Sequence, residues 1–328
     1  MDFLSYHANM GSGLSRTIKG FPGGGGAMQI IARTSRDPIV PHWSMWPLHS
    51  MALLAQTLAL LAMTVATVAI KVVPLDMAQD SFDDQYRGCG PAMTAALPAL
   101  NHSEFEQNPL FAQAWEKATA EWQSRGSPVS PLSSPAQAIA LMAYTMEDVY
   151  KKFNDAVRVA GSSSQEYRDN FHFKTLHFLL TDALATLRDT REPQCHNVYW
   201  GVRGVRFKAE QGDIVRFGQF TSVSLNGTTA NDFGIDTVFH VHTCHGVGIW
   251  EFSNYPGKKE VLISPFETFE VIGVSQEGDR ARIQLLSTGI FSNYNCEWLR
   301  GGSVPRAPFH LSGLLLATTA LAVATGIL

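Results

Sequence analysis

The chain has few charged side chains for its length, and neither sign dominates. Of its 328 residues, 16% are Asp, Glu, Lys or Arg, and the formal net charge is -4. Lys and Arg are scattered, whereas surfaces that bind nucleic acid gather them into a basic patch. We therefore expect no nucleic-acid partner. The hydrophobic content of 45% is enough for the buried core of a globular domain.

Two widespread functional motifs are missing. No G-x-G-x-x-G follows a strand pattern, which argues against a dinucleotide bound in the Rossmann manner. No G-x-S-x-G is present, so nothing specific supports a serine hydrolase with a nucleophile elbow. A metal site is not expected either. His240 and His242 alternate on one predicted strand, but Cys244 is needed for a disulfide and no further ligand has a recognisable spacing.

Long uncharged apolar runs occur twice, near the two ends of the chain. Residues 51–70 carry no charged side chain, and small residues such as Ala66 and Ala69 offer cleavage positions, which favours a removable signal peptide over a retained membrane span. Residues 311–328 form the second run, and small residues followed by a short spacer precede it. This layout is typical of a glycosylphosphatidylinositol (GPI) attachment signal, with a plain transmembrane span as the alternative. The small residues are Gly301, Gly302 and Ser303.

These runs divide the chain into four expected segments. Residues 1–50 are an unstructured extension or an artefact of the gene prediction, and residues 51–70 are the signal peptide. Residues 71–300 form the folded domain, and residues 301–328 are the GPI-attachment signal, which is removed. The mature protein is then expected to pass through the endoplasmic reticulum to the cell surface, or to be secreted.

Cysteine is scarce, and all four cysteines lie between the two apolar runs. They are Cys89, Cys195, Cys244 and Cys296. An even number in an oxidising compartment indicates two disulfide bonds, although four cysteines alone allow three pairings. Asn101 and Asn226 each begin an acceptor sequon, so both are candidate glycosylation sites.

The local pattern changes once, near Pro193. Before it, apolar residues recur at helical spacing, as in residues 111–122, 149–157 and 176–187. After it come short strand-like stretches separated by Gly, Asn, Asp and Pro. The predicted strands are NVYWGV, DIVRFG, TVFHVHT, GIWEF, EVLIS, ETFEVIG and ARIQLLS. Helices followed by strands predict an α+β fold.

An ordered series of short motifs resembles the vertebrate ecto-mono-ADP-ribosyltransferases, the arginine-specific, GPI-anchored type. The motifs are DSFDDQYRGC (80–89), MAYT (142–145), FHFKTLHF (171–178), VYWGVRG (198–204), RFGQFTSVS (216–224), YPGKKEVLISPFE (255–267) and SNYNC (292–296). The resemblance implies the ADP-ribosyltransferase fold, in which a helical N-terminal part packs on a split, antiparallel-rich sheet and NAD lies in the cleft. It also implies the disulfide pairs Cys89–Cys296 and Cys195–Cys244.

The resemblance implies a site as well. In the family an Arg on the first strand meets the NAD diphosphate, and the next Gly presents its backbone to the nicotinamide amide. These positions are Trp200 and Gly201 here. The family's Ser on the following strand corresponds to Ser222, which is expected to hold the carboxylate of Glu260 in register. Further cleft candidates by family position are Tyr144, Gln219 and Ser253.

The chemistry explains why Glu260 and its neighbour matter. Breaking the bond between nicotinamide and ribose develops positive charge on the ribose carbon, which a fixed carboxylate stabilises. The family reads Glu-x-Glu at this point, and this chain reads Lys258, Lys259, Glu260. Because the first Glu orients the acceptor arginine and eases loss of its proton, Lys258 is expected to weaken transfer more than NAD cleavage. Trp200 cannot clamp phosphate as a guanidinium does, so NAD binding is expected to weaken too.

Two functions remain at this point. The first is an NAD-dependent mono-ADP-ribosyltransferase that acts on protein arginine, weakened toward NAD hydrolysis. The second is a catalytically inactive cell-surface interaction protein with the same fold. Glu260, Ser222 and Gly201 favour the enzyme, whereas Trp200 and Lys258 favour the inactive protein. We prefer the enzyme, with NAD as its substrate, no metal, extracellular or luminal protein arginines as acceptors, a lipid anchor and a monomeric state.

Overall fold

The structure, a computed structural model, describes residues 70–192, 194–227, 234–278 and 280–301. The expected extension (1–50), nearly all of the expected signal peptide and residues 302–328 lie outside the described residues. In the described stretches, no helix has both the length and the apolar character needed to cross a membrane.

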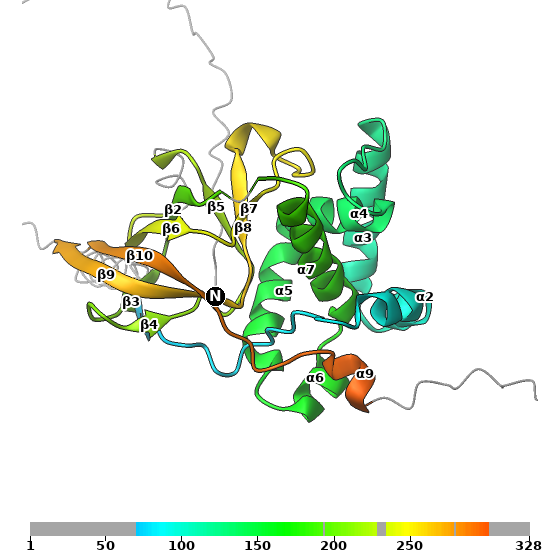
Figure 1. Cartoon of the computed structure of the whole chain (residues 1–328), viewed down its shortest axis with the longest axis horizontal. Coiled ribbons are helices and arrows are strands. Elements are labelled where there is room, and N and C mark those ends of the chain that lie inside the picture. The colour runs from blue at the N-terminus through cyan, green and yellow to red at the C-terminus, as the bar shows by residue number, and fades with distance from the viewer. Residues whose placement is uncertain (1–69, 193, 228–233, 279, 302–328) are drawn as a thin grey trace, which may run out of the picture. The chain divides into compact units, whose positions relative to one another are not determined.

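Helices fill the first part of the described chain, as the sequence predicts (Figure 1). Three of them begin with a side-chain cap, because Asn108, Ser134 and Ser163 accept hydrogen bonds from backbone N–H groups of the first turn. The helices are α2 (Gly90–Gln107), α3 (Pro109–Ser124), α4 (Pro135–Thr145), α5 (Glu147–Ala160), α6 (Ser164–Asn170), α7 (Lys174–Asp189) and, after the strands, α9 (Glu297–Gly301).

The apolar positions predicted from helical spacing form the core between these helices. Phe111, Val149, Phe153, Leu176 and Leu187 are completely buried. Helix α7 is buried along most of its length, because it contacts α2 and α4 as well as the sheet. The same cluster includes apolar residues of the strands, so helices and sheet share one core on this side.

Most strands join one mixed, largely antiparallel sheet in the order β4-β9-β10-β6-β2-β5-β8-β7. Only β10 and β6 run parallel within it, and β1 and β3 form a separate parallel pair. The strands are β1 (Lys71–Pro74), β2 (His196–Val202), β3 (Val205–Lys208), β4 (Ile214–Val215), β5 (Thr221–Ser224), β6 (Thr237–Thr243), β7 (Val247–Gly248), β8 (Glu260–Ile263), β9 (Glu267–Glu277) and β10 (Arg280–Ile290). The predicted α+β class is confirmed.

The sheet is joined at its middle by a single residue pair. β2 pairs with β6 along its whole length, but it meets β5 only through Tyr199 and Ser224. Beyond this pair, residues 200–202 of β2 have no described strand on the β5 side. In the half formed by β5, β8 and β7, Leu262 of β8 and Val247 of β7 pack into the helical core, together with Phe220 just before β5. The expected split of the sheet therefore lies between β2 and β5.

Two predicted strands are mostly wrong. Of DIVRFG (213–218), only Ile214 and Val215 form a strand. Of GIWEF (248–252), only Gly248 belongs to a strand, and the chain then turns, with the Phe252 N–H donating to the Ile249 carbonyl at 2.9 Å. The Trp250 ring covers Gly248 so closely that a Cβ there would lie 2.0 Å from a ring atom. Ile249 and Phe252 are buried. The apolar run thus reflects a buried turn, which a short pattern cannot distinguish from a buried strand.

Both ends of the described domain are tied together. The disulfides are Cys89–Cys296 and Cys195–Cys244, which is the pairing that the resemblance implies. Next to the first bond, the buried carboxylates of Asp83 and Asp84 accept backbone N–H groups of residues 293–297. The DSFDDQYRGC motif therefore binds the SNYNC segment through its acidic side chains.

Candidate active site

The centre of the site is the carboxylate of Glu260, the first residue of β8, which is only 7% exposed. The Ser222 hydroxyl donates to its Oε1 at 2.9 Å, and the Ser253 hydroxyl donates to its Oε2. Each oxygen of this buried carboxylate therefore has a hydroxyl donor. Such a charge is held in a fixed position before any ligand arrives, which is the requirement for electrostatic catalysis.

The pairing of β5 with β8 brings Ser222 and Glu260 together. Ser224 lies opposite Glu260 in the register, and its hydroxyl donates to the carbonyl of Lys258 at 3.2 Å. Lys259 has the left-handed φ of 45°, which ends the short 3₁₀ turn of residues 256–258 and starts β8 at Glu260. Ser224 thus fixes the turn, and Ser222 fixes the carboxylate.

Ser253 reaches Glu260 from a loop that the helical part holds in place. Arg125, just after α3, donates to the carbonyls of Ser253 at 2.7 Å and Asn254 at 3.3 Å. The Thr145 hydroxyl, at the end of α4, accepts the Asn254 N–H at 2.8 Å. The sequence did not indicate Arg125, because Arg125 and Ser253 are 128 residues apart in the chain and only the folded structure brings them together.

Tyr144 is a buried support for β5. Its hydroxyl donates to the Phe220 carbonyl at 2.8 Å, and the Asn154 amide donates to the same carbonyl at 2.9 Å. Burial raises the pKa of the Tyr144 phenol, so it stays neutral. The structure therefore places the hydroxyl of this expected cleft residue against Phe220, the residue just before the strand that carries Ser222.

Gln219 meets a cation that the sequence reasoning did not single out. Its Oε1 accepts a hydrogen bond from Arg158 of α5, and the same guanidinium pairs with Asp155. The Arg158 side chain is 37% exposed. The sequence does contain a signal for Arg158. It lies four residues after Asn154, so a helix places both polar side chains on one face.

Trp200 lies in an aromatic cluster at the split of the sheet. Its ring centroid is 5.2 Å from those of both Phe239 and Phe217. Tyr199, rather than Trp200, stands in register with Ser224 and, across β5, with Glu260. Gly201 lies just beyond the junction of β2 and β5. The backbone of Gly201 therefore lies in the part of β2 that does not pair with β5.

The comparisons with known proteins agree with this geometry. Residues 75–293 match the family described as ART, NAD:arginine ADP-ribosyltransferase. The chain belongs to this family. It is 52% identical over 234 residues to the erythroblast NAD(P)(+)-arginine ADP-ribosyltransferase of Gallus gallus, covering 70% of this chain and 78% of the relative. It is 44% identical over 273 residues to the GPI-linked NAD(P)(+)-arginine ADP-ribosyltransferase 1 of Homo sapiens, covering 78% and 84%.

Solved structures of this family share the fold. The crystal structure of the eukaryotic mono-ADP-ribosyltransferase ART2.2 aligns with a TM-score of 0.59 at 36% identity, covering 69% of this chain and 98% of that one. A mutant of ART2.2 has been solved in complex with NAD, with the same TM-score of 0.59. The ADP-ribosyltransferase fold expected from the motifs is therefore confirmed.

The ADP-ribosyltransferase domain carries an unusual cation beside its carboxylate. Lys258 lies in the turn directly before Glu260, and its Nζ is 4.2 Å from the centroid of the Tyr255 ring. This contact is a cation–π interaction, which orients the ammonium group on the turn.

One cluster in the ADP-ribosyltransferase domain has metal-like spacing but the wrong chemistry. Side-chain atoms of Cys195, His242 and Cys244 lie within 4.8 Å of one another. The two sulfurs are joined as a disulfide, so neither is a thiolate that could bind a metal. The Nδ1 of His242 lies 2.9 Å from the Asn197 side-chain oxygen.

Proposed function

We propose that this chain is an NAD-dependent mono-ADP-ribosyltransferase, which transfers ADP-ribose to protein arginine and releases nicotinamide. The observation that carries the proposal is the buried carboxylate of Glu260, whose oxygens accept hydrogen bonds from Ser222 and Ser253. Membership of the NAD:arginine ADP-ribosyltransferase family supports NAD as the substrate and arginine as the acceptor.

The proposed reaction is a displacement at the ribose carbon. The bond to the nicotinamide nitrogen breaks, and its electron pair neutralises the positive ring as nicotinamide leaves. Glu260 stabilises the positive charge that develops on the ribose. A guanidinium nitrogen of the acceptor then forms the new bond and loses a proton to the solvent, because Lys258 stands where the family has a proton-accepting Glu. Because Ser222 and Ser253 already orient the carboxylate, little reorganisation is needed during the reaction.

We further propose a division of labour for NAD binding. The backbone at Gly201 takes the nicotinamide amide, as the resemblance implies. Trp200 offers only a neutral indole at the position of the phosphate clamp, so we assign the contact with the diphosphate to a cation elsewhere in the site. Arg158 fits this role, because it is partly exposed and hydrogen-bonded to Gln219, next to the strand that carries Ser222. The ion pair with Asp155 lowers the net positive charge around Arg158, so we expect weaker NAD binding than an unpaired arginine would give.

We also propose that the protein is held at the cell surface by a GPI anchor. Relatives in human, rabbit and mouse are named GPI-linked, and two disulfides fit an oxidising compartment. Of the expected attachment residues, Gly301 ends α9, and Gly302 and Ser303 lie outside the described residues. Treatment of expressing cells with phosphatidylinositol-specific phospholipase C is expected to release the protein. Retention on the cells would contradict the anchor.

The decisive experiment measures nicotinamide release and labelled ADP-ribosyl-agmatine formation from NAD. We expect Glu260→Gln to lower both rates at least about a hundredfold, because the charge at the ribose is lost. Glu251→Gln is the matched control, since this carboxylate is half exposed and pairs with Arg191. It is expected to leave both rates unchanged. If the wild-type protein neither binds NAD nor releases nicotinamide, the inactive surface protein is the correct function.

A further inference from the structure

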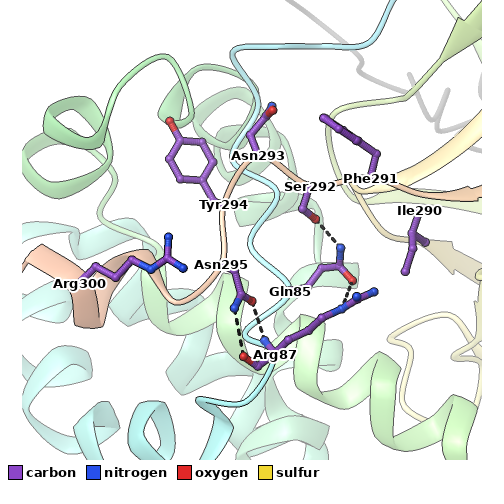
Figure 2. Close-up of a pocket in the computed structure, with 9 residues that line it drawn as sticks. All are labelled: Gln85, Arg87, Ile290, Phe291, Ser292, Asn293, Tyr294, Asn295 and Arg300. Atoms are coloured by element: carbon purple, nitrogen blue, oxygen red, sulfur yellow. Dashed lines mark hydrogen bonds between the residues drawn. The ribbon is translucent and has the colours of Figure 1, made fainter.

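A hollow lies away from the residues of the candidate active site. Figure 2 shows it between two segments that are far apart in the sequence, residues 85–87 and 290–300. Its volume is about 510 Å³, within the usual range for sites that take small ligands. None of the residues assigned to NAD cleavage lines it. We call it the terminal groove, because its second wall leads into α9.

The walls of the terminal groove are bound to each other. The Arg87 N–H donates to Asn295 Oδ1 at 2.7 Å, and the Asn295 amide returns a hydrogen bond to the Arg87 carbonyl at 3.1 Å. Gln85 Nε2 donates to the Ser292 hydroxyl at 2.5 Å. The disulfide between Cys89 and Cys296 closes the same region. The groove is thus formed before a ligand arrives, which lowers the entropic cost of binding.

The terminal groove is positively charged. Arg87 and Arg300 both line it and both are exposed, and no carboxylate is among its lining residues. Within the described part of the chain, neither guanidinium forms an ion pair. The neighbouring Asp84 is turned inward, where it accepts backbone N–H groups, and Asp83 pairs with the buried Arg216.

The two cations are separated along the groove. Figure 2 shows Arg300 at one end and the guanidinium of Arg87 toward the other, with Asn295 between them. Arg87 Nε donates to Gln85 Oε1 at 3.0 Å, which orients its guanidinium.

Between the cations lie the side-chain amides of Gln85 and Asn295, each of which uses one donor and one acceptor within the walls and keeps one of each for the hydroxyls of a polyol. The Ser292 hydroxyl donates to the Asp83 carbonyl, so toward a ligand it can only accept. Phe291 also lines the groove and is 44% exposed, and its ring contacts the guanidinium of the buried Arg216.

We propose that the terminal groove binds a sugar or polyol that carries phosphate groups at two separated positions. Each guanidinium presents a planar fork of donors that matches phosphate oxygens, and such charge-assisted hydrogen bonds are among the strongest in proteins. The phosphates then lie at the two ends, and the hydroxyls of the ligand face Asn295 and Ser292. This inference does not depend on the proposed reaction, because the groove shares no residue with that site.

Titration calorimetry with fructose 1,6-bisphosphate tests the proposal, with saturating NAD present to fill the cleavage site. We expect the bisphosphate to bind more tightly than fructose 6-phosphate, and fructose itself to show no binding. Arg87→Gln and Arg300→Gln are each expected to weaken bisphosphate binding about tenfold or more. Arg282→Gln is the matched control, because Arg282 is exposed and pairs with Glu277 on the β9–β10 hairpin. It is expected to bind as the wild type does.

A second arm separates a soluble ligand from a lipid headgroup. Sedimentation with phosphatidylcholine vesicles is compared with and without phosphatidylinositol 4-phosphate, whose phosphates lie on opposite sides of the ring. Binding in either arm that is lost in both Arg variants supports the groove and identifies the source. Unfolding midpoints of the variants verify that they are folded, and Arg300→Lys is expected to bind with intermediate strength. Absence of binding in both arms, or binding that neither Arg→Gln substitution changes, would overturn the proposal.

Discussion

Trp200 stacks on Phe239, with ring centroids 5.2 Å apart and ring planes 20° apart. Phe217 meets the same indole nearly at a right angle. The position that the family resemblance gives to a phosphate-binding arginine is therefore part of an aromatic cluster formed by β2, β6 and the segment between β4 and β5. A substitution at this position changes both the stability of the cluster and the charge near NAD.

Trp200→Arg is expected to tighten NAD binding ten- to a hundredfold, because a guanidinium restores a forked phosphate contact worth roughly 1.5 to 3 kcal/mol. The same change lowers the free energy of unfolding by about 1 kcal/mol or more, since the aromatic pairs are lost. Calorimetry with NAD and urea unfolding measure the two effects. Trp200→Leu is the control, which is expected to destabilise without tightening. Equal NAD affinity in the Arg and Leu variants would show that this side chain does not reach the phosphates.

Lys258→Glu is expected to raise the rate of transfer to agmatine and to leave NAD affinity nearly unchanged. The new carboxylate accepts the proton of the acceptor and removes a like charge, whose repulsion costs roughly 1 to 4 kcal/mol at contact distance. Initial rates of ADP-ribosyl-agmatine formation measure the gain. Lys259→Glu makes the same charge change one residue later, on an exposed side chain, and is expected to give a smaller gain. An equal gain in both variants would indicate a general charge effect.

The two sequons are expected to differ in use. Asn226 is exposed after β5, whereas Asn101 lies inside α2 with its side-chain oxygen buried and without a hydrogen-bond partner. The transferring enzyme needs access to the side-chain amide, so we expect a glycan at Asn226 only. Gel mobility before and after treatment with a peptide N-glycosidase is compared for Asn226→Gln and Asn101→Gln. A mobility shift that survives Asn226→Gln but disappears in Asn101→Gln would reverse this assignment.

His177 is expected to make the protein less stable in mild acid. It is completely buried, its Nε2 lies 3.1 Å from the Phe82 carbonyl, and its Nδ1 lies 2.9 Å from the Tyr86 hydroxyl. A carbonyl only accepts, so Nε2 carries the proton, and Nδ1 accepts from the phenol. Burial lowers the pKa of His177 to about 3. The ring is therefore neutral in the folded protein across mild acid.

The unfolded chain binds a proton at this histidine below about pH 6.5, and the folded chain does not until about pH 3. The contribution of His177 to the free energy of unfolding is therefore complete above pH 6.5. Below that pH it decreases by about 1.4 kcal/mol per pH unit. Urea unfolding between pH 7 and pH 5 measures the slope. His177→Gln is expected to flatten it, and the exposed His102→Gln is expected to leave it unchanged. Identical slopes in wild type and His177→Gln would contradict the assignment.

Local patterns predicted the parts of the fold that depend on local sequence. The helical core followed from the spacing of residues such as Phe153 and Leu176, and the strands EVLIS and TVFHVHT followed from β-rich runs between turn residues. The GIWEF run failed because burial on both sides leaves the same apolar pattern in a strand and in a turn. Only the packed structure shows that Trp250 folds back over Gly248.

The candidate site divides in the same way. The motifs suggested Glu260 and its partner Ser222, and the register of β5 and β8 brings them together. The role of Ser253 depends on a loop that Arg125, just after α3, holds in place, and no local sequence pattern contains this long-range contact. The environment of Trp200 was equally hidden, because its neighbours come from separate segments of the chain.

The bond between Cys89 and Cys296 has a mechanical consequence for a protein attached through its C-terminal end. With the lipid anchor proposed above, a pulling force on the C-terminal end would enter the domain through α9 and reach Cys296 within a few residues. The disulfide bond then transmits part of this force to Cys89, just before α2, so that less of it pulls β10 away from the sheet. Mechanical force on the anchored protein would thus act mainly on the disulfide bond and the helices, and less on β5 and β8, which hold the Glu260 carboxylate.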